Sequence, residues 1–158
     1  MHRLRAATDH DADAIAGTWH DAWHDAHDAH VPIALVADRP LTYFRERVPH
    51  LIGHTTVAQD TAGIVGFVTV TDDELDLLFV AARGRGTGVA VDLLSHGEHQ
   101  LAADYDTGWL DVVTGNARAR AFYRRQGWRD TGPVAHAIDT STGPATVHSN
   151  RYEKWLRG

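Results

Sequence analysis

The segment that most constrains the fold is a glycine-rich turn between an expected strand and an expected helix. Residues 75–80 are apolar, as in a buried strand, and residues 89–101 repeat apolar side chains at helical spacing. Gly84, Gly86 and Gly88 lie between them. Glycine permits positive φ and close approach of a ligand to the backbone, and a helix start offers unpaired N–H groups and the positive end of the dipole. The sequence therefore predicts a phosphate cradle.

Two common phosphate-binding patterns do not fit this turn. A P-loop needs a lysine after its last glycine, and none follows here. A dinucleotide fingerprint needs G-x-G-x-x-G in an early βαβ unit, whereas the spacing here is G-x-G-x-G. A flexible loop without a ligand is the remaining alternative. It is disfavoured because the glycines lie at a helix start rather than a helix end.

Strand and helix patterns alternate along the rest of the chain. Strands are expected at residues 3–8, 55–60, 63–73, 74–81 and 108–115, with a closing hairpin at 134–139 and 145–156. Helices are expected at 11–27, from 41 to just before Pro49, at 87–105 and at 116–127, with residues 31–40 as a linker. This mixed order in 158 residues predicts one α/β domain over residues 1–158.

Composition excludes several classes of protein. A net charge of −6 argues against a general nucleic-acid binder. Because the chain has no cysteine, it has no disulfide, no zinc–thiolate site and no cysteine nucleophile. The N-terminus lacks an apolar signal segment, and the longest apolar run, residues 31–37, is too short to cross a bilayer. We expect a cytoplasmic protein without membrane contact.

Two motifs carry a resemblance to a known family. Arg85–Ala90 resembles the (Arg or Gln)-x-x-Gly-x-(Gly or Ala) signature of the GNAT superfamily of acyl-CoA-dependent N-acyltransferases. Its flanks also resemble the family's, except that Ala82 stands where Pro is frequent. Residues 116–128 resemble the family's N-x-x-A-x-x-F-Y-x-x-x-G-(F or W) segment. The resemblance covers about residues 65–128 and implies a central mixed, mostly antiparallel sheet of about seven strands, flanked by about four helices.

The resemblance implies acetyl-CoA as co-substrate and assigns residues to it. The strand before the turn pairs with pantetheine and supplies a backbone oxyanion donor, here from Phe79 and Val80. Asn116 hydrogen-bonds the pantetheine arm, and it also suits a helix N-cap. Tyr123 protonates the leaving thiolate, with aromatic packing beside Phe122 as the alternative role. The segment expected to grip the diphosphate comprises Arg85, Gly86, Thr87, Gly88, Val89 and Ala90.

Acyl transfer also requires a neutral amine. An alkyl ammonium has a pKa near ~10.4, so a base or a desolvating pocket must help. Glu74 and Asp76 are the candidate bases, expected on one strand face with Leu78 and Val80 because side chains alternate. A solvated acidic turn is the alternative, and some family members use a water chain instead of a single base.

Four histidines lie in one short stretch, at positions 20, 24, 27 and 30. They could bind a metal, form a solvated helix flank or border an acceptor pocket. Because Trp19 and Trp23 should face the core, the flank is expected mainly in water. The stretch lacks H-E-x-x-H and an obvious third ligand, so no metal is expected. By resemblance, His30 and His136 are the candidate acceptor contacts. The arginines at 118, 120, 124, 125 and 129 can meet the CoA 3′-phosphate or balance surface acids.

The expected activity is transfer of acetyl from acetyl-CoA to a primary amine of a small molecule. Transfer should be direct, because no cysteine can carry the acyl group. A protein amine and an aminoacyl-tRNA are alternative acceptors. The acidic net charge disfavours tRNA and favours a cationic amine such as a polyamine or an aminoglycoside. A non-catalytic acyl-CoA-binding regulatory domain and a metal sensor are the rival functions, and a homodimer is common in the family.

Overall fold

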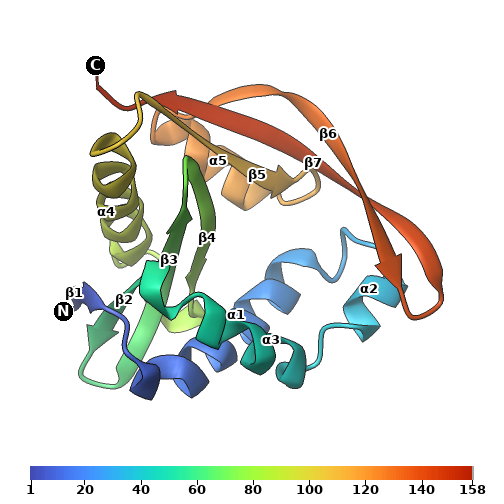
Figure 1. Cartoon of the computed structure of the whole chain (residues 1–158), viewed down its shortest axis with the longest axis horizontal. Helices are drawn as coiled ribbons and strands as arrows, with labels where there is room; N and C mark the ends of the chain where they lie inside the picture. Colours follow the sequence, from blue (N-terminus) through green and yellow to red (C-terminus); the bar gives the residue numbers. More distant parts are fainter. Residues whose placement is uncertain (158) are drawn as a thin grey trace.

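The computed structural model describes residues 1–157 and contains one seven-stranded sheet in the order β1-β2-β3-β4-β5-β7-β6 (Figure 1). Every neighbouring pair is antiparallel except β4 and β5, which are parallel. This confirms the predicted mixed, mostly antiparallel sheet. The strands are β1 (Arg3–Ala6), β2 (Thr55–Asp60), β3 (Gly63–Thr71), β4 (Glu74–Val80), β5 (Thr107–Val113), β6 (Arg129–Thr140) and β7 (Gly143–Trp155).

Five α-helices lie within the described residues, one more than predicted. They are α1 (Ala12–His27), α2 (Ile33–Ala37), α3 (Leu41–Arg47), α4 (Val89–Ala102) and α5 (Ala117–Arg125). The additional helix, α2, falls in the segment expected to be a linker. It is short and buries only Leu35, so the sequence contains no repeated apolar spacing that would reveal it. None of the described helices is long and apolar enough to span a membrane.

The helices cover the sheet on both faces. On one face, Leu93 and Leu94 of α4 pack with Tyr152 of β7 and with Tyr123 of α5 in one buried cluster. On the other face, α1 and α3 pack on β3 and β4 through a cluster that includes Trp19, Phe44 and Phe67 (Figure 1). Each face therefore has its own apolar core, with the sheet between them.

A β-bulge in β4 changes which face its acidic side chains occupy. Leu77 pairs with Thr69 and Leu75 pairs with Val70, so Asp76 is the extra residue. As a result, Leu75, Leu78 and Val80 pack on the α4 side, whereas Leu77 and Phe79 pack on the α1 side. The expectation that Glu74 and Asp76 share a face with Leu78 and Val80 is therefore wrong. Strict alternation fails at the bulge, and both carboxylates lie on the α1 side.

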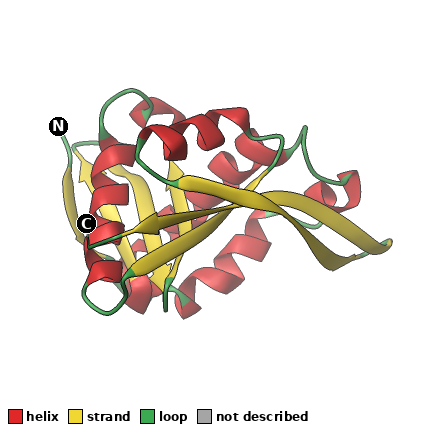
Figure 2. Ribbon diagram, turned by 90° about the horizontal axis from the view of Figure 1, so that it is seen from above, coloured by secondary structure: helices red, strands yellow, loops and turns green. Residues whose placement is uncertain are grey.

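Two features of the sheet create room for a site. β4 and β5 pair at a single position, Glu74 with Trp109, and the strands then diverge. The β6–β7 hairpin extends beyond the rest of the sheet to reach α2 (Figure 2). There Ser141 donates hydrogen bonds from its backbone N (2.8 Å) and its Oγ (2.6 Å) to the Asp38 carboxylate. The hairpin tip is thereby tied to the C-terminal end of α2.

Candidate active site

A cavity of about 370 Å³ lies where β4 and β5 diverge, enclosed by α1, β4, the glycine turn, the start of α4 and α5. Eight predicted cofactor residues line it: Phe79, Val80, Arg85, Gly86, Gly88, Ala90, Asn116 and Tyr123. Two do not. The Thr87 hydroxyl donates to the Gly84 carbonyl (2.5 Å), and the Val89 side chain is buried in the core beneath α4. The Val89 amide can still reach a cofactor, whereas the Thr87 amide also donates to the Gly84 carbonyl (3.4 Å).

The glycine turn presents free amides to this cavity. Gly86 (φ +73°) and Gly88 (φ +87°) adopt left-handed conformations, and a Cβ at either position would meet open space. Gly88 is the N-cap of α4. Within the described chain, the amides of residues 86 and 88–90 donate to no acceptor, while Asp92 makes the first helical bond, to the Gly88 carbonyl. Unpaired amides at a helix N-terminus fit a phosphate group.

The predicted basic cluster divides into two groups. Arg118 and Arg125 line the cavity and form no ion pair with the acids described here, so they are available to phosphates. Arg120 instead contacts Asp130 (3.1 Å) and the Tyr152 hydroxyl (3.0 Å).

Arg85 also lines this cavity, but it pairs with Asp25 of α1. That guanidinium lowers the pKa of the Asp25 carboxyl. Anion binding at Arg85 therefore competes with an existing ion pair.

The backbone of β4 offers donors on its diverging edge. Ala81 N donates to the Val65 carbonyl of β3 (2.8 Å). Because hydrogen-bonded and non-bonded pairs alternate in an antiparallel ladder, the Phe79 amide also points toward β3. The amides of Leu78 and Val80 therefore point to the open side. This supports the choice of Val80 and corrects that of Phe79, which contributes its side chain to the cavity instead.

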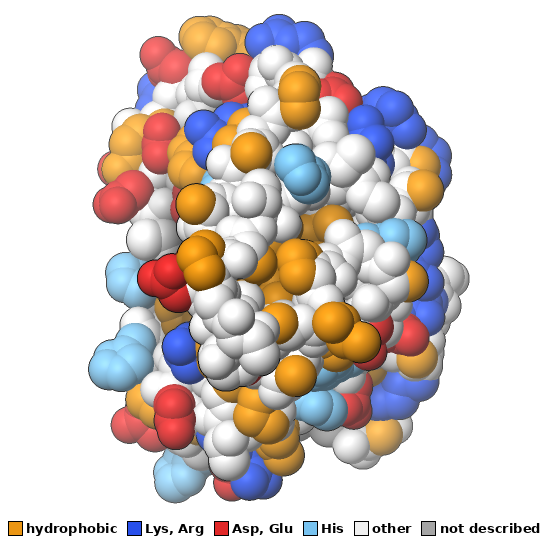
Figure 3. Space-filling view, turned by 90° about the vertical axis from the view of Figure 1, so that its right-hand side faces the viewer, with side chains coloured by type: hydrophobic (Ala, Val, Ile, Leu, Met, Phe, Trp, Pro, Cys, Tyr) orange, Lys and Arg blue, Asp and Glu red, His pale blue; other side chains and the backbone are white. Residues whose placement is uncertain are grey.

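A second cavity, of about 360 Å³, lies beside the first, between α1–α3, β4, β5 and the β6–β7 hairpin. We name the first the cofactor cavity and the second the acceptor cavity. On the face formed by α2 and the hairpin, hydrophobic side chains gather around a central hollow (Figure 3). Both cavities are lined by Leu78, Phe79, Asn116, Ala119 and Tyr123. The two cavities therefore meet at the point where β4 separates from β5.

Tyr123 occupies this junction. Its side chain is 8% exposed, and burial raises the pKa of the phenol above its ordinary value. The phenol is therefore protonated at neutral pH and can donate a proton. Asn116 caps α5 as predicted, because its Oδ1 accepts from the Ala119 amide (3.2 Å). Its Nδ2 has no acceptor among the described residues, so it is free to donate into either cavity.

Acidic groups lie at the β4–β5 end of the acceptor cavity. Asp76 and Asp111 line it. Arg151 contacts both Asp111 carboxylate oxygens (2.8 and 3.0 Å), so most of that charge is neutralised. Partial loss of solvent around the Asp76 carboxyl raises its pKa. Nearby, burial and then the charges of Asp76 and Asp111 raise the pKa of Glu74 to about 7.

The two histidines predicted to contact the acceptor lie in different places. His136 of β6 lines the acceptor cavity and contacts Asp111 (3.1 Å). His30 is exposed and lies against Gly115, where a Cβ would come within 2.5 Å of its Nδ1. His30 lines neither cavity, so the structure offers no support for a substrate contact there.

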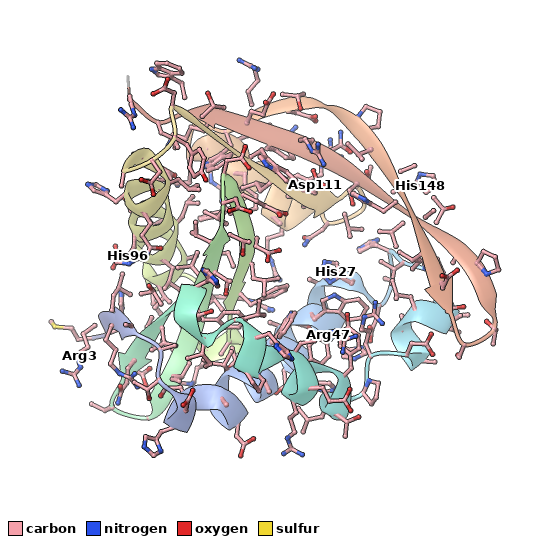
Figure 4. All side chains as sticks on the ribbon, viewed as in Figure 1. Arg3, His27, Arg47, His96, Asp111 and His148 are labelled. Atoms are coloured by element: carbon pink, nitrogen blue, oxygen red, sulfur yellow. The ribbon has the colours of Figure 1, made fainter. Side chains whose placement is uncertain are left out.

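The histidine stretch is mostly structural, but one member lies elsewhere than its sequence pattern predicts. His24 contacts Asp28 (2.7 Å) and the Arg39 carbonyl (2.6 Å). His27 was expected on the solvated flank but lines the acceptor cavity, with its ring 4.9 Å from Trp23 and 6.4 Å from Phe79. In Figure 4 it lies in the space between α1 and β5, the strand that carries Asp111. Its i, i+4 relation to Trp23 was the signal that could have found it.

Burial lowers the pKa of His27 to about 4, so this imidazole is neutral at pH 7. Its Nδ1 is buried and has no partner in hydrogen-bond geometry. The Trp23 carbonyl, one turn earlier, raises the pKa of His27, but by less than burial lowers it. Among residues 1–157, no group of three or more His, Cys, Asp or Glu side chains is arranged to hold a metal ion.

Comparison with known proteins identifies the family. A family profile described as "Acetyltransferase (GNAT) domain" matches residues 39–137. The chain belongs to the GNAT acetyltransferase family. It is therefore an acetyltransferase that uses acetyl-CoA, and the free amides and arginines of the cofactor cavity fit that co-substrate.

Solved structures show the same fold. The apo form of YjaB from Escherichia coli matches with a TM-score of 0.73 and 20% identity over 95% of this chain and 97% of that one. The PaiA N-acetyltransferase from Thermoplasma acidophilum, in complex with coenzyme A, matches with a TM-score of 0.71 and 14% identity over 98% of this chain and 99% of that one. YncA from Salmonella typhimurium, with its cofactor acetyl-CoA, matches with a TM-score of 0.69 and 16% identity over 100% of this chain and 95% of that one. No curated protein matches the sequence significantly.

Proposed function

We propose that this GNAT enzyme transfers acetyl directly from acetyl-CoA to the primary amine of a small molecule. The observation that carries the proposal is the junction of the two cavities at Tyr123, beside the open amides of β4. A thioester held along the cofactor cavity would end at this junction. An amine in the acceptor cavity would approach it from the opposite side.

Each step of the transfer has a candidate group. The amine nitrogen attacks the thioester carbon, forming the C–N bond, and the Leu78 or Val80 amide stabilises the charge on the carbonyl oxygen. The C–S bond then breaks, and Tyr123 donates its proton to the departing sulfur. The nitrogen loses its second proton as the amide forms, and this proton restores the phenol. Asp76 lines the cavity and attracts the ammonium, and Glu74 accepts the surplus amine proton through water, since its pKa lies near neutrality.

The size of the acceptor cavity supports a small acceptor. The cavity has a volume of about 360 Å³, and residues of the β6–β7 hairpin, among them His136 and Ile138, line one side of it. The net charge of −6 disfavours an aminoacyl-tRNA acceptor. A purely regulatory acyl-CoA-binding domain would need neither Tyr123 at the junction nor a second cavity beside it.

The proposal is tested by two measurements on the purified chain. Calorimetry measures CoA affinity, and a thiol-release assay measures acetyl-CoA consumption with a panel of small primary amines. We expect CoA to bind and at least one amine to accelerate thiol release well above the rate without amine. Tight CoA binding with no amine-dependent release, or release only with peptides, would overturn the small-molecule assignment. Absence of CoA binding would overturn the use of the cofactor cavity.

A further inference from the structure

The acceptor cavity contains a guanidinium without a counter-ion. Arg39 follows α2, lines this cavity and is only partly exposed. It forms no ion pair with any acid among residues 1–157, and its one side-chain hydrogen bond goes to the Asp38 carbonyl (3.3 Å). Burial lowers the pKa of Arg39 from its ordinary value. The protein therefore holds a partly desolvated positive charge that no carboxylate of the described residues contacts directly, and the charge of the neighbouring Asp38 offsets it only in part.

Surrounding groups both position this guanidinium and leave it free. It lies over the Tyr43 ring at 3.9 Å and 5.9 Å from the Trp23 ring, which are favourable cation–π distances. His24 Nε2 contacts the Arg39 carbonyl, so the backbone is held as well. The nearest acid in sequence, Asp38, accepts hydrogen bonds from Ser141 on both of its carboxylate oxygens and makes no ion pair with Arg39.

The cavity is therefore polarised. Arg39 lies at the α2–α3 end, whereas Asp76 and Asp111 lie at the β4–β5 end. The wall between the two ends includes the apolar side chains of Leu35 and Ile138 and the rings of Trp23 and Phe79. A ligand that satisfies all three regions has a positive group, an apolar body and a negative group.

We propose that the acceptor is an amino acid whose primary amine and carboxylate lie at opposite ends of an apolar or aromatic skeleton. This inference rests on the proposed function and specifies its substrate class. The amine lies toward Asp76, near the cavity junction, and the carboxylate accepts charge-assisted hydrogen bonds from Arg39. A polyamine would place a cation beside Arg39 without a counter-charge, so polyamines should be poor acceptors.

Two matched pairs of probe amines test the inference, because each pair differs only by a carboxylate. They are 6-aminohexanoate against pentylamine, and 4-(aminomethyl)benzoate against benzylamine. We expect wild-type kcat/KM for at least one acid to exceed that of its neutral partner by about tenfold to 100-fold, as for one charge-assisted hydrogen bond. Arg39→Gln should abolish this preference mainly by lowering kcat/KM for the acid, and Arg39→Lys should restore part of it.

Arg47→Gln is the matched control. Arg47 stacks on the same tyrosine ring (3.4 Å), but it is exposed and does not line the cavity, so the preference should persist. Equal rates for both members of each pair, a preference for spermidine, or an unchanged preference in Arg39→Gln would overturn the inference. If no probe is acetylated, calorimetry of the same pairs with the CoA-loaded protein gives the comparison by affinity. That result separates failure of the inference from failure of the transferase proposal.

Discussion

At the scale of single residues, Tyr123 is the group on which the chemistry most directly depends. Tyr123→Phe removes the phenolic hydroxyl and keeps the ring that packs against Trp128 and Tyr152. We expect kcat to fall by about 10²- to 10⁴-fold, the usual contribution of a positioned acid, with CoA affinity changed less than about twofold. Stopped assays of thiol release and calorimetry measure the two quantities. Equal kcat in a folded variant would show that solvent, not Tyr123, protonates the sulfur.

Glu74 determines the direction in which kcat/KM changes with pH. Its pKa is raised to about 7, so the carboxylate able to accept a proton is lost as pH falls through that value. We expect kcat/KM to decrease below about pH 7 in the wild type, and Glu74→Gln to lose this limb of the profile. Asp76→Asn should keep a limb at lower pH, because the charge of Asp76 is one cause of the raised pKa. An unchanged profile in Glu74→Gln would assign the limb to another group.

The same shift predicts a stability effect. An acid with a raised pKa binds more protons in the folded state, so the free energy of unfolding decreases as pH rises from the ordinary value of 4.5 to about 7. Glu74→Gln should reduce this decrease. Urea unfolding of both proteins at pH 5 and pH 8 measures the difference. Relative to the wild type, the free energy of unfolding of Glu74→Gln should be larger at pH 8 than at pH 5. An equal difference at the two pH values would contradict the assignment of the effect to Glu74.

At the scale of elements, the glycine turn depends on Gly84, which lines the cofactor cavity and also packs closely against β3 and β4. A Cβ on Gly84 would lie 2.6 Å from Val65 Cγ2 and 2.9 Å from Val80 Cγ1. We expect Gly84→Ala to lower the free energy of unfolding by about 1–3 kcal/mol through overpacking. Gly53→Ala is the control, since no atom lies within 4 Å of its Cβ and its φ is not positive. Chemical denaturation compares the two, and equal stabilities would show that the turn can relax.

The limits of sequence reasoning also lie at the element scale. Period-two and period-3.6 patterns located the strands and four helices, because those elements bury one face along several residues. Motif resemblance located most of the cofactor cavity, because a glycine turn and a helix start are local in sequence. The bulge at Asp76 was not visible, since register depends on the partner strand β3. Arg39 and His27 were missed because the cavity that both line is completed by β4, β5 and the β6–β7 hairpin, which are distant from them in sequence.

At the scale of the whole molecule, the two cavities span the divergence of the sheet, so a bound co-substrate should join its two parts. The cofactor cavity is lined by β4 and the start of α4 on one side and by α5 on the other, whereas β4 and β5 pair at only one position. CoA at 100 times its Kd should stabilise the fold by about 2.7 kcal/mol. For a chain of this size, that corresponds to a rise in Tm of about 5–10 °C.

Comparison with pantetheine shows which contacts produce this stabilisation. Pantetheine lacks the diphosphate that the amides of residues 86 and 88–90, with Arg118 and Arg125, are placed to bind. Its Tm shift at equal concentration should therefore be much smaller, and the CoA shift should shrink with added salt because exposed guanidinium–phosphate contacts are screened. Scanning calorimetry over a concentration series measures both. If pantetheine raised Tm as much as CoA does, the glycine turn would not be the anchor, and the strand edge at Leu78 and Val80 would carry the binding.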